Sequence, residues 1–246
     1  MTRFDGKIVV LTGAARGLGR AAAQLLAAHG ASLALVDILG EEVEELAREL
    51  GSGTRAFAAD LSQVFEIQAV VGAVVEHFGG IDVLINNAAI CPRISFQEST
   101  EEDWDQLMSV NAKSQFFLMQ AVCPSMRERG GGRIVNVISA SGQFGAVANA
   151  SIYSGSKGAI IAFSKSVARE VAADGIVVNC FSPGTMRTDL ITNLTQEQQE
   201  EVQQMIPLGR FATTEEMAVN LAFVASDECS FTTGATFDFI GGCLMR

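Results

Sequence analysis

Apolar runs alternate with amphipathic segments along the whole chain. Seven runs have the continuous apolar character of a strand buried on both faces; they are residues 7–13, 32–37, 54–60, 81–88, 132–139, 175–184 and 235–242. Six segments between them have helical periodicity; they are residues 17–30, 41–50, 62–78, 101–129, 152–173 and 214–225. This alternation predicts an α/β fold of the doubly wound Rossmann type, a seven-stranded parallel sheet with helices on both faces.

The alternation has one interruption, at residues 185–213. No Pro- or Ser-rich linker and no internal repeat divides the chain, so we expect one domain over residues 1–246. The interruption contains the polar helical stretch LITNLTQEQQEEVQQM at 190–205. A polar insertion at the carboxyl end of a sheet is where a substrate lid would lie, so residues 185–213 are a candidate lid; a surface loop is the alternative.

Composition narrows the possible partners. The formal net charge of −11 would repel nucleic acid and anionic lipid, so we expect neither as a partner. Five cysteines without a CxxC pair indicate free thiols in a reducing, cytoplasmic setting. No apolar run approaches the roughly 20 residues of a membrane span, and we see no signal peptide. The two histidines lie near predicted helix ends without partners at ligand spacing, so we expect no metal site.

The segment TGAARGLG at 12–19 joins the first predicted strand to the first predicted helix. Its glycines let the backbone approach a ligand closely, and the helix start aims N–H groups and the positive end of its dipole at a pyrophosphate. In this context the segment predicts a dinucleotide site, with a tight turn as the weaker alternative. The candidate contacts are Gly13, Arg16, Gly17, Leu18 and Gly19.

Asp37 ends the second predicted strand, eighteen residues after Gly19. A carboxylate at this place can accept hydrogen bonds from both ribose hydroxyls of adenosine, and it would repel the extra phosphate of NADP. Arg16 favours that phosphate instead, but desolvating a carboxylate against a phosphate dianion is costly. We therefore expect NAD as the cofactor, with NADP less favoured.

The only tyrosine of the chain, Tyr153, lies four residues before Lys157 in the segment SIYSGSK. Residues at i and i+4 share a helix face, and a nearby ammonium lowers the pKa of a phenol from its ordinary value of about 10. The pair predicts a general acid–base; a core tyrosine beside a snorkelling lysine is the alternative. Two neighbours favour the chemical reading, because Ser139 ends a strand at the carboxyl edge and Asn111 is unusual inside a long predicted helix.

The chain resembles the short-chain dehydrogenase/reductase family over its whole length. The motifs that carry the resemblance, in the family's order and spacing, are TGAARGLG, NNAA at 86–89, Asn111, Ser139, YSGSK and SPG at 182–184. The resemblance implies that Tyr153 exchanges a proton with the substrate oxygen and that Ser139 holds this oxygen. It also implies that Lys157 lowers the pKa of the tyrosine and binds the nicotinamide ribose, and that Asn111 holds a water that relays protons.

Further cofactor contacts follow from the same resemblance. They are Asp60 at the adenine with Leu61 beside it, Asn87 and Ala88 at the fourth predicted strand, and Pro183, Gly184 and Thr188, the last near the nicotinamide amide. The chain departs from the family pattern in three places. Ala89 replaces a glycine, Ile240 replaces an aspartate, and an extra residue between Ser139 and Tyr153 leaves a shared role for Ser141 open.

The segments around the predicted site are mostly apolar, which favours a small hydrophobic secondary alcohol or ketone as the substrate. We therefore expect an NAD-dependent alcohol dehydrogenase or carbonyl reductase. The family resemblance and apolar stripes on both sides of helix 152–173 favour a homotetramer.

Two alternatives remain open. One is a 3-oxoacyl-carrier-protein reductase; such reductases usually favour NADPH, against Asp37, and need a basic surface for an acidic partner. Arg127, Arg129 and Arg169 are candidates for that surface, although the net charge of −11 counts against it. The other alternative is a non-enzymatic NAD(H)-binding sensor on the same fold.

Overall fold

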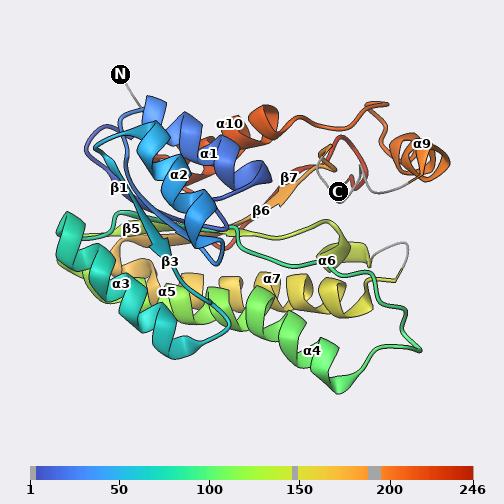
Figure 1. The fold of residues 1–246 in the computed structure, drawn as a ribbon, viewed down its shortest axis with the longest axis horizontal. Helices are drawn as coiled ribbons and strands as arrows, with labels where there is room; N and C mark the ends of the chain where they lie inside the picture. The colour runs from blue at the N-terminus through green and yellow to red at the C-terminus, as the bar shows by residue number, and fades with distance from the viewer. Residues whose placement is uncertain (1–3, 146–148, 188–194, 246) are drawn as a thin grey trace.

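One parallel sheet forms the centre of the computed structural model, which describes residues 4–145, 149–187 and 195–245 (Figure 1). The strand order is β3-β2-β1-β4-β5-β6-β7, and every pairing is parallel. The strands are β1 Ile8–Thr12, β2 Ser32–Asp37, β3 Thr54–Ala58, β4 Val83–Asn86, β5 Gly132–Val137, β6 Ile176–Pro183 and β7 Thr236–Phe239. The predicted doubly wound α/β fold with seven parallel strands is confirmed.

Helices cover both faces of this sheet, because successive strand residues point to opposite sides. Val9 and Leu11 of β1 face the core under α1, α2 and α10, while Val10 faces the core under α3, α5 and α7 (Figure 1). These helices are α1 Gly17–Ala28, α2 Gly40–Leu50, α3 Val64–Phe78, α5 Ser114–Glu128, α7 Ser151–Val171 and α10 Thr214–Ala225. Within the described ranges, none of the helices is both long enough and apolar enough to cross a membrane.

The last crossover differs in hand from the two before it. The steps from β4 to β5, β5 to β6 and β6 to β7 all run in the same direction along the sheet. The first two steps pass through α5 and α7 on one face, whereas α10 lies beside α1 on the opposite face (Figure 1). A crossover that moves in the same direction over the other face has the opposite hand. The connection from β6 to β7 is therefore left-handed, an exception to the rule that crossovers between parallel strands are right-handed.

The predicted long helix 101–129 is interrupted. It consists of α4 Glu101–Met108, a π-helical turn Ser109–Lys113 and α5. In the turn, the N–H of Ser114 bonds the carbonyl of Ser109, five residues earlier. The structure also adds a short helix, α6 Ser141–Phe144, that was not predicted, and α9 Gln196–Gln204 in the polar stretch of the candidate lid.

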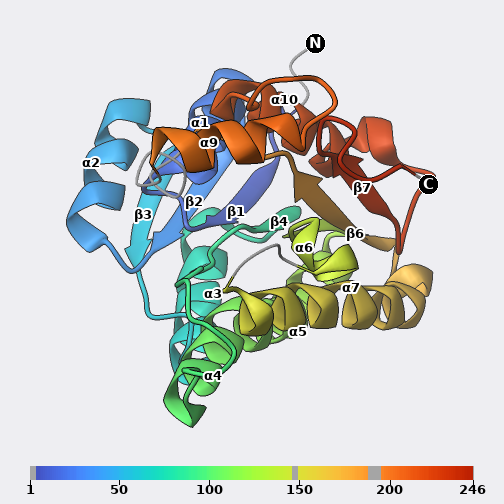
Figure 2. The same cartoon turned by 90° about the vertical axis from the view of Figure 1, so that its right-hand side faces the viewer.

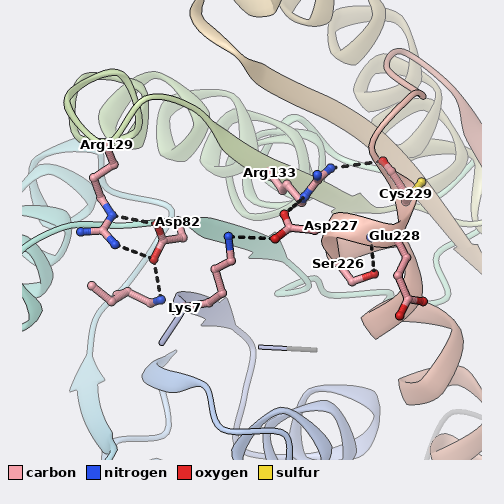
Figure 3. A network of polar contacts seen from close by, with 9 residues as sticks. Lys7, Asp82, Arg129, Arg133, Ser226, Asp227, Glu228 and Cys229 are labelled. Atoms are coloured by element: carbon pink, nitrogen blue, oxygen red, sulfur yellow. Dashed lines mark hydrogen bonds and ion pairs between the residues drawn. The ribbon is translucent and has the colours of Figure 1, made fainter. Parts of the chain in front are cut away.

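Charged side chains tie the elements together at the amino end of the sheet. Lys7, just before β1, and Arg133 of β5 both pair with Asp227, each at 3.0 Å (Figure 3). Arg129 forms a two-pronged pair with Asp82, which also accepts the N–H of Ile8 (Figure 3). These contacts lie at the edge opposite the strand ends that hold the predicted site residues, so they serve the fold.

Candidate active site

The predicted catalytic side chains meet where the strands end at the carboxyl edge of the sheet. Ser139 follows β5, Tyr153 and Lys157 lie in the first two turns of α7, and Asn111 lies in the π-helical turn. The short helix α6 packs on α7 beside them (Figure 2). The fold therefore brings together four residues that are up to 46 positions apart, counted from Asn111 to Lys157.

Tyr153 and Lys157 share one face of α7, as their spacing predicts. The Lys157 Nζ lies 5.7 Å from the centroid of the Tyr153 ring and donates a hydrogen bond of 2.8 Å to the carbonyl of Val137, at the end of β5. Lys157 is 1% exposed. Burial lowers the pKa of Lys157 to about 8, since it disfavours the charged ammonium, while Cys91 and Cys180 act in the opposite direction.

The sequence predicts that Lys157 lowers the pKa of Tyr153, and for the protein without cofactor this prediction is wrong. Burial raises the pKa of Tyr153 above its ordinary value, and the negative charge of Cys91 in its thiolate form adds to this, whereas the hydrogen bond with Ser139 opposes it. The buried phenolate is disfavoured because the protein cannot solvate it as water does. Tyr153 is therefore held as the neutral phenol, which is the form that can donate a proton.

Ser139 is the serine that contacts the tyrosine. Its Oγ accepts two hydrogen bonds from Ser141, from the N–H at 3.2 Å and from the hydroxyl at 2.8 Å. Both lone pairs of the Ser139 oxygen are then used, so its own hydrogen is available to donate. The sequence left open whether Ser141 shares the role of Ser139. In the structure Ser141 donates hydrogen bonds to Ser139, and it is Ser139 that bonds Tyr153, so Ser141 orients Ser139.

Asn111 is fully buried in the π-helical turn, and both the oxygen and the nitrogen of its carboxamide are hydrogen-bonded. Its Oδ1 accepts the N–H of Ile90 at 2.8 Å, and its Nδ2 donates to the carbonyl of Ile90 at 2.9 Å and to Ser156 Oγ at 3.2 Å. Asn111 thus clamps the loop after β4 to α7. Turns of this kind often mark functional sites, and the proton relay through Asn111 stays a prediction.

The glycine-rich loop at 12–19, predicted to bind a pyrophosphate and called the phosphate loop below, is packed too tightly for side chains at two of its glycines. A Cβ on Gly19 would collide with the carbonyl oxygen of Gly13, and a Cβ on Gly13, where φ is +62°, would lie 2.8 Å from the Cα of Ala88. Asn87 closes this contact by donating to the carbonyls of Thr12 and Gly13 at 3.1 and 3.0 Å. Asn87 therefore braces the glycine-rich loop against the end of β4.

We expect Gly19→Ala to weaken dinucleotide binding by more than about tenfold, because the added Cβ must displace the loop predicted to meet the pyrophosphate. Gly72→Ala is the matched control, since it adds a Cβ to an exposed position of α3 with open space around it. That control should bind the dinucleotide normally and gain about 1 kcal/mol of stability. Fluorescence titration with the reduced dinucleotide checks both variants; equal affinity in both would contradict a pyrophosphate site here.

Asp37 and Arg16 already have partners within the loop region. The two carboxylate oxygens of Asp37 accept the N–H groups of Ala15 and Leu39, at 2.9 and 3.0 Å. The Arg16 guanidinium pairs with Glu42 of α2, with Nε 2.6 Å from Oε2. Asp37 therefore has a structural function that the sequence did not indicate.

The other predicted cofactor contacts lie after β3 and at the end of β6. Asp60 caps a turn by accepting the N–H of Ser62 at 2.9 Å, and Leu61 beside it is buried. Pro183 ends β6, and a Cβ on Gly184 would lie 2.8 Å from the carbonyl oxygen of Phe239 in β7. Thr188 lies outside the described residues.

A cavity of about 510 Å³ adjoins this strand end. It is bounded by the loop after β6, the segment before α10, and β7. Gly184, Thr185 and Asp238 line it, whereas the four predicted catalytic residues do not. The described residues contain no cluster of three or more side chains of His, Cys, Asp or Glu placed to hold a metal ion.

The sequence analysis did not identify three residues that lie near the site. Thr12 is buried and its Oγ1 accepts the N–H groups of Asn87 and Ala88, at 2.9 and 3.0 Å. Cys91 lies close enough to Tyr153 and Lys157 to influence the pKa of both, and burial raises the pKa of its own thiol. Gln143 of α6 bonds Asp238 of β7. The place of Thr12 inside the glycine motif was the only available signal.

Comparisons with known proteins agree with this architecture over nearly the whole chain. The family described as Enoyl-(Acyl carrier protein) reductase matches residues 13–243. The 3-oxoacyl-[acyl-carrier-protein] reductase FabG of Vibrio cholerae is 36% identical, covering 98% of this chain and 99% of its own length. FabG of Thermotoga maritima is 37% identical over 99% and 100% of the two chains, and nodulation protein G of Rhizobium meliloti is 35% identical over the full length of both.

These relatives correct two expectations. The predicted alcohol dehydrogenase or carbonyl reductase acting on a hydrophobic alcohol or ketone is wrong, because the matching relatives are named as reductases of carrier-bound 3-oxoacyl groups. The preference for NAD is wrong with it, since reductases of that type usually use NADPH. The preference rested on Asp37, whose two oxygens accept backbone N–H groups and so also hold the loops after β1 and β2.

The glycine-rich loop after β1, the serine after β5 and the tyrosine–lysine pair on α7 lie together in a chain that matches FabG proteins from end to end. The chain is an oxidoreductase that belongs to the short-chain dehydrogenase/reductase family.

Proposed function

We propose that this protein is a 3-oxoacyl-[acyl-carrier-protein] reductase that uses NADPH to reduce the 3-keto group of a carrier-bound acyl thioester to a 3-hydroxyl group. The observation that carries the proposal is the full-length similarity to the FabG relatives, at 35 to 37% identity. The grouping of Ser139, Tyr153 and Lys157 supports it, because these side chains can handle one carbonyl oxygen and one proton.

The residues around the phosphate loop fit a dinucleotide. No side chain caps the amino end of α1 and its first turn contains no acidic residue, so its N–H groups can bind a pyrophosphate. Arg16 would hold the 2′-phosphate of NADPH by exchanging Glu42 for it, because a dianion attracts a guanidinium more strongly than one carboxylate does. When bound, NADPH supplies the hydride.

The chain's own residues then handle the substrate oxygen. Ser139 donates its hydrogen to the keto oxygen, since both of its acceptor positions are occupied by Ser141. Tyr153, a neutral phenol in this site, gives its proton to the oxygen as negative charge develops there. The charged form of Lys157 stabilises the phenolate that remains, and the Asn111 clamp holds the loop beside it in place.

The candidate docking residues for the carrier lie away from the predicted site. Arg127 and Arg129 lie where α5 ends and Arg169 lies in the last turn of α7, so all three are near the amino ends of β5 and β6. Arg127 and Arg129 also pair with Asp174 and Asp82 at 2.6 and 2.8 Å. The structure therefore does not support these arginines as the docking surface of an acidic carrier protein. The single domain, the lid at 185–213 and the homotetramer stay predictions.

An assay with NADPH and a 3-oxoacyl thioester on the carrier, or on a short pantetheine arm, tests the proposal. We expect reduction, a lower KM for NADPH than for NADH, and a KM for NADPH that rises at least about tenfold in Arg16→Ala, since one charge-assisted contact to the phosphate is lost. Turnover of a secondary alcohol with NAD but of no 3-oxoacyl thioester would overturn the proposal. Tight cofactor binding without turnover of any substrate would instead favour the sensor.

A further inference from the structure

The short helix α6 starts two residues after Ser139 and is held from two sides. On one side, Gly142 lies against the backbone of α7, where a Cβ would come within 2.7 Å of the Lys157 backbone carbon. On the other side, the Gln143 Nε2 donates a hydrogen bond of 2.6 Å to Asp238 Oδ1 on β7. At its start, Ser141 donates two hydrogen bonds to Ser139 Oγ.

The contact between Gln143 and Asp238 has a defined direction. A carboxylate can only accept, so the NH₂ group of the glutamine must face Asp238. This leaves the Gln143 Oε1 buried and without a partner among the described residues. The bond is also charge-assisted, which makes it roughly twice as strong as a neutral one.

Asp238 lies on β7 beside the end of β6, which leads into the predicted cofactor contacts Pro183 and Gly184. In the register of the sheet, Asp238 lies beside Ser182, directly before Pro183 and Gly184. Ser182 is 0% exposed, and its Oγ has no hydrogen-bond partner within the described part of the chain. The bond from Gln143 therefore joins the helix after Ser139 to the strand pair that leads into the 183–184 turn.

We propose that Gln143 is a positioning residue: its hydrogen bond to Asp238 holds α6, and through Ser141 the catalytic Ser139, at a fixed place relative to β6 and β7. This inference rests on the proposed reduction of a keto group. Gln143 need not touch the substrate. It acts because a shift of α6 would break the Ser141 contacts and move the hydroxyl of Ser139 away from the carbonyl oxygen, and small misplacements of this kind cost large factors in rate.

Gln143→Glu tests the bond by facing one carboxylate with another. We expect kcat to fall about tenfold or more, with the NADPH Kd within about twofold of the wild type, because the phosphate loop lies on other elements. The double variant Gln143→Glu with Asp238→Asn restores a hydrogen bond with its donor and acceptor exchanged, and should recover most of kcat. Gln106→Glu, the same change on an exposed position of α4, is the control and should behave as wild type.

Amide hydrogen exchange of residues 139–145 is the readout without substrate. It should speed up in Gln143→Glu and return in the double variant. An unchanged kcat and exchange in Gln143→Glu, or a double variant no better than the single one, would overturn the inference. If the wild type reduces no 3-oxoacyl thioester, the proposed function fails, while the exchange data still decide whether the bond holds α6.

Discussion

Replacing Tyr153 with phenylalanine is expected to lower kcat for reduction of a 3-oxoacyl thioester by about 10³-fold. Phenylalanine keeps the ring that packs 5.7 Å from the Lys157 Nζ, but it has no proton to give to the substrate oxygen. NADPH affinity should change by less than about twofold, since the proposed pyrophosphate site lies at α1 and not at α7. Steady-state rates and fluorescence titration measure the two effects separately.

A control for this variant lies on the same helix. Ser166→Ala also removes one hydroxyl from α7, at an exposed position, and should leave kcat unchanged. If Tyr153→Phe kept more than about a tenth of the wild-type kcat, Tyr153 could not be the proton donor, because general acid catalysis contributes at least about a hundredfold.

The variant also makes the protein free of tyrosine, since Tyr153 is the only one. The difference in near-ultraviolet absorbance between wild type and Tyr153→Phe therefore reports ionisation of this phenol alone. Without cofactor, ionisation should begin at higher pH than for a free tyrosine, because burial raises the pKa of Tyr153. Adding NADP⁺, whose nicotinamide is cationic, should move the titration to lower pH.

The second large effect concerns Lys157. In the wild type, kcat/KM for reduction should fall as the pH rises through about 8, because burial lowers the pKa of Lys157 to about 8 and the neutral amine no longer stabilises the phenolate. Lys157→Met should be slower by about 10²-fold or more and should lack this inflection. A pH–rate profile of both proteins checks this; an inflection that persists in Lys157→Met would assign it to another group.

The same pKa predicts a dependence of stability on pH, with a defined sign. Between the folded pKa of about 8 and the unfolded pKa of 10.5, the unfolded chain binds more protons at Lys157 than the folded chain does. The free energy of unfolding should therefore rise with pH across this window, by about 3 kcal/mol at most. Lys157→Met serves as the reference, because the difference between the two denaturation series removes the contributions of all other groups.

Much of the fold, and the grouping of the candidate catalytic residues, could be predicted from local pattern. A strand buried on both faces must be apolar throughout, so β1, β4, β5 and β6 were visible in the sequence. Tyr153 and Lys157 share a helix face by spacing alone, and Ser139 was placed by the rule that parallel strands end at the functional edge. These inferences held because each depends on residues that are neighbours along one element.

The sequence failed where a residue's state depends on what surrounds it in space. The shift in the pKa of Tyr153 comes first from burial and then from Cys91 and Ser139, which lie on other elements, and not from the lysine one turn along. Asp37 accepts backbone N–H groups from two loops, a structural role that its position at a strand end did not indicate. The bond between Gln143 and Asp238 spans 95 positions and leaves no periodic trace in the chain.

The sequence by itself determined the order of strands and helices along the chain, the helix face shared by Tyr153 and Lys157 and the place of the glycine-rich loop, because periodicity and glycine content are local properties. Only the tertiary structure decided the hand of the last crossover, the π-helical turn at Asn111 and the protonation preference of Tyr153 and Lys157. Burial and hydrogen bonding are set by groups brought together from distant segments, and these terms control both ionisation and the choice of partner for a polar side chain.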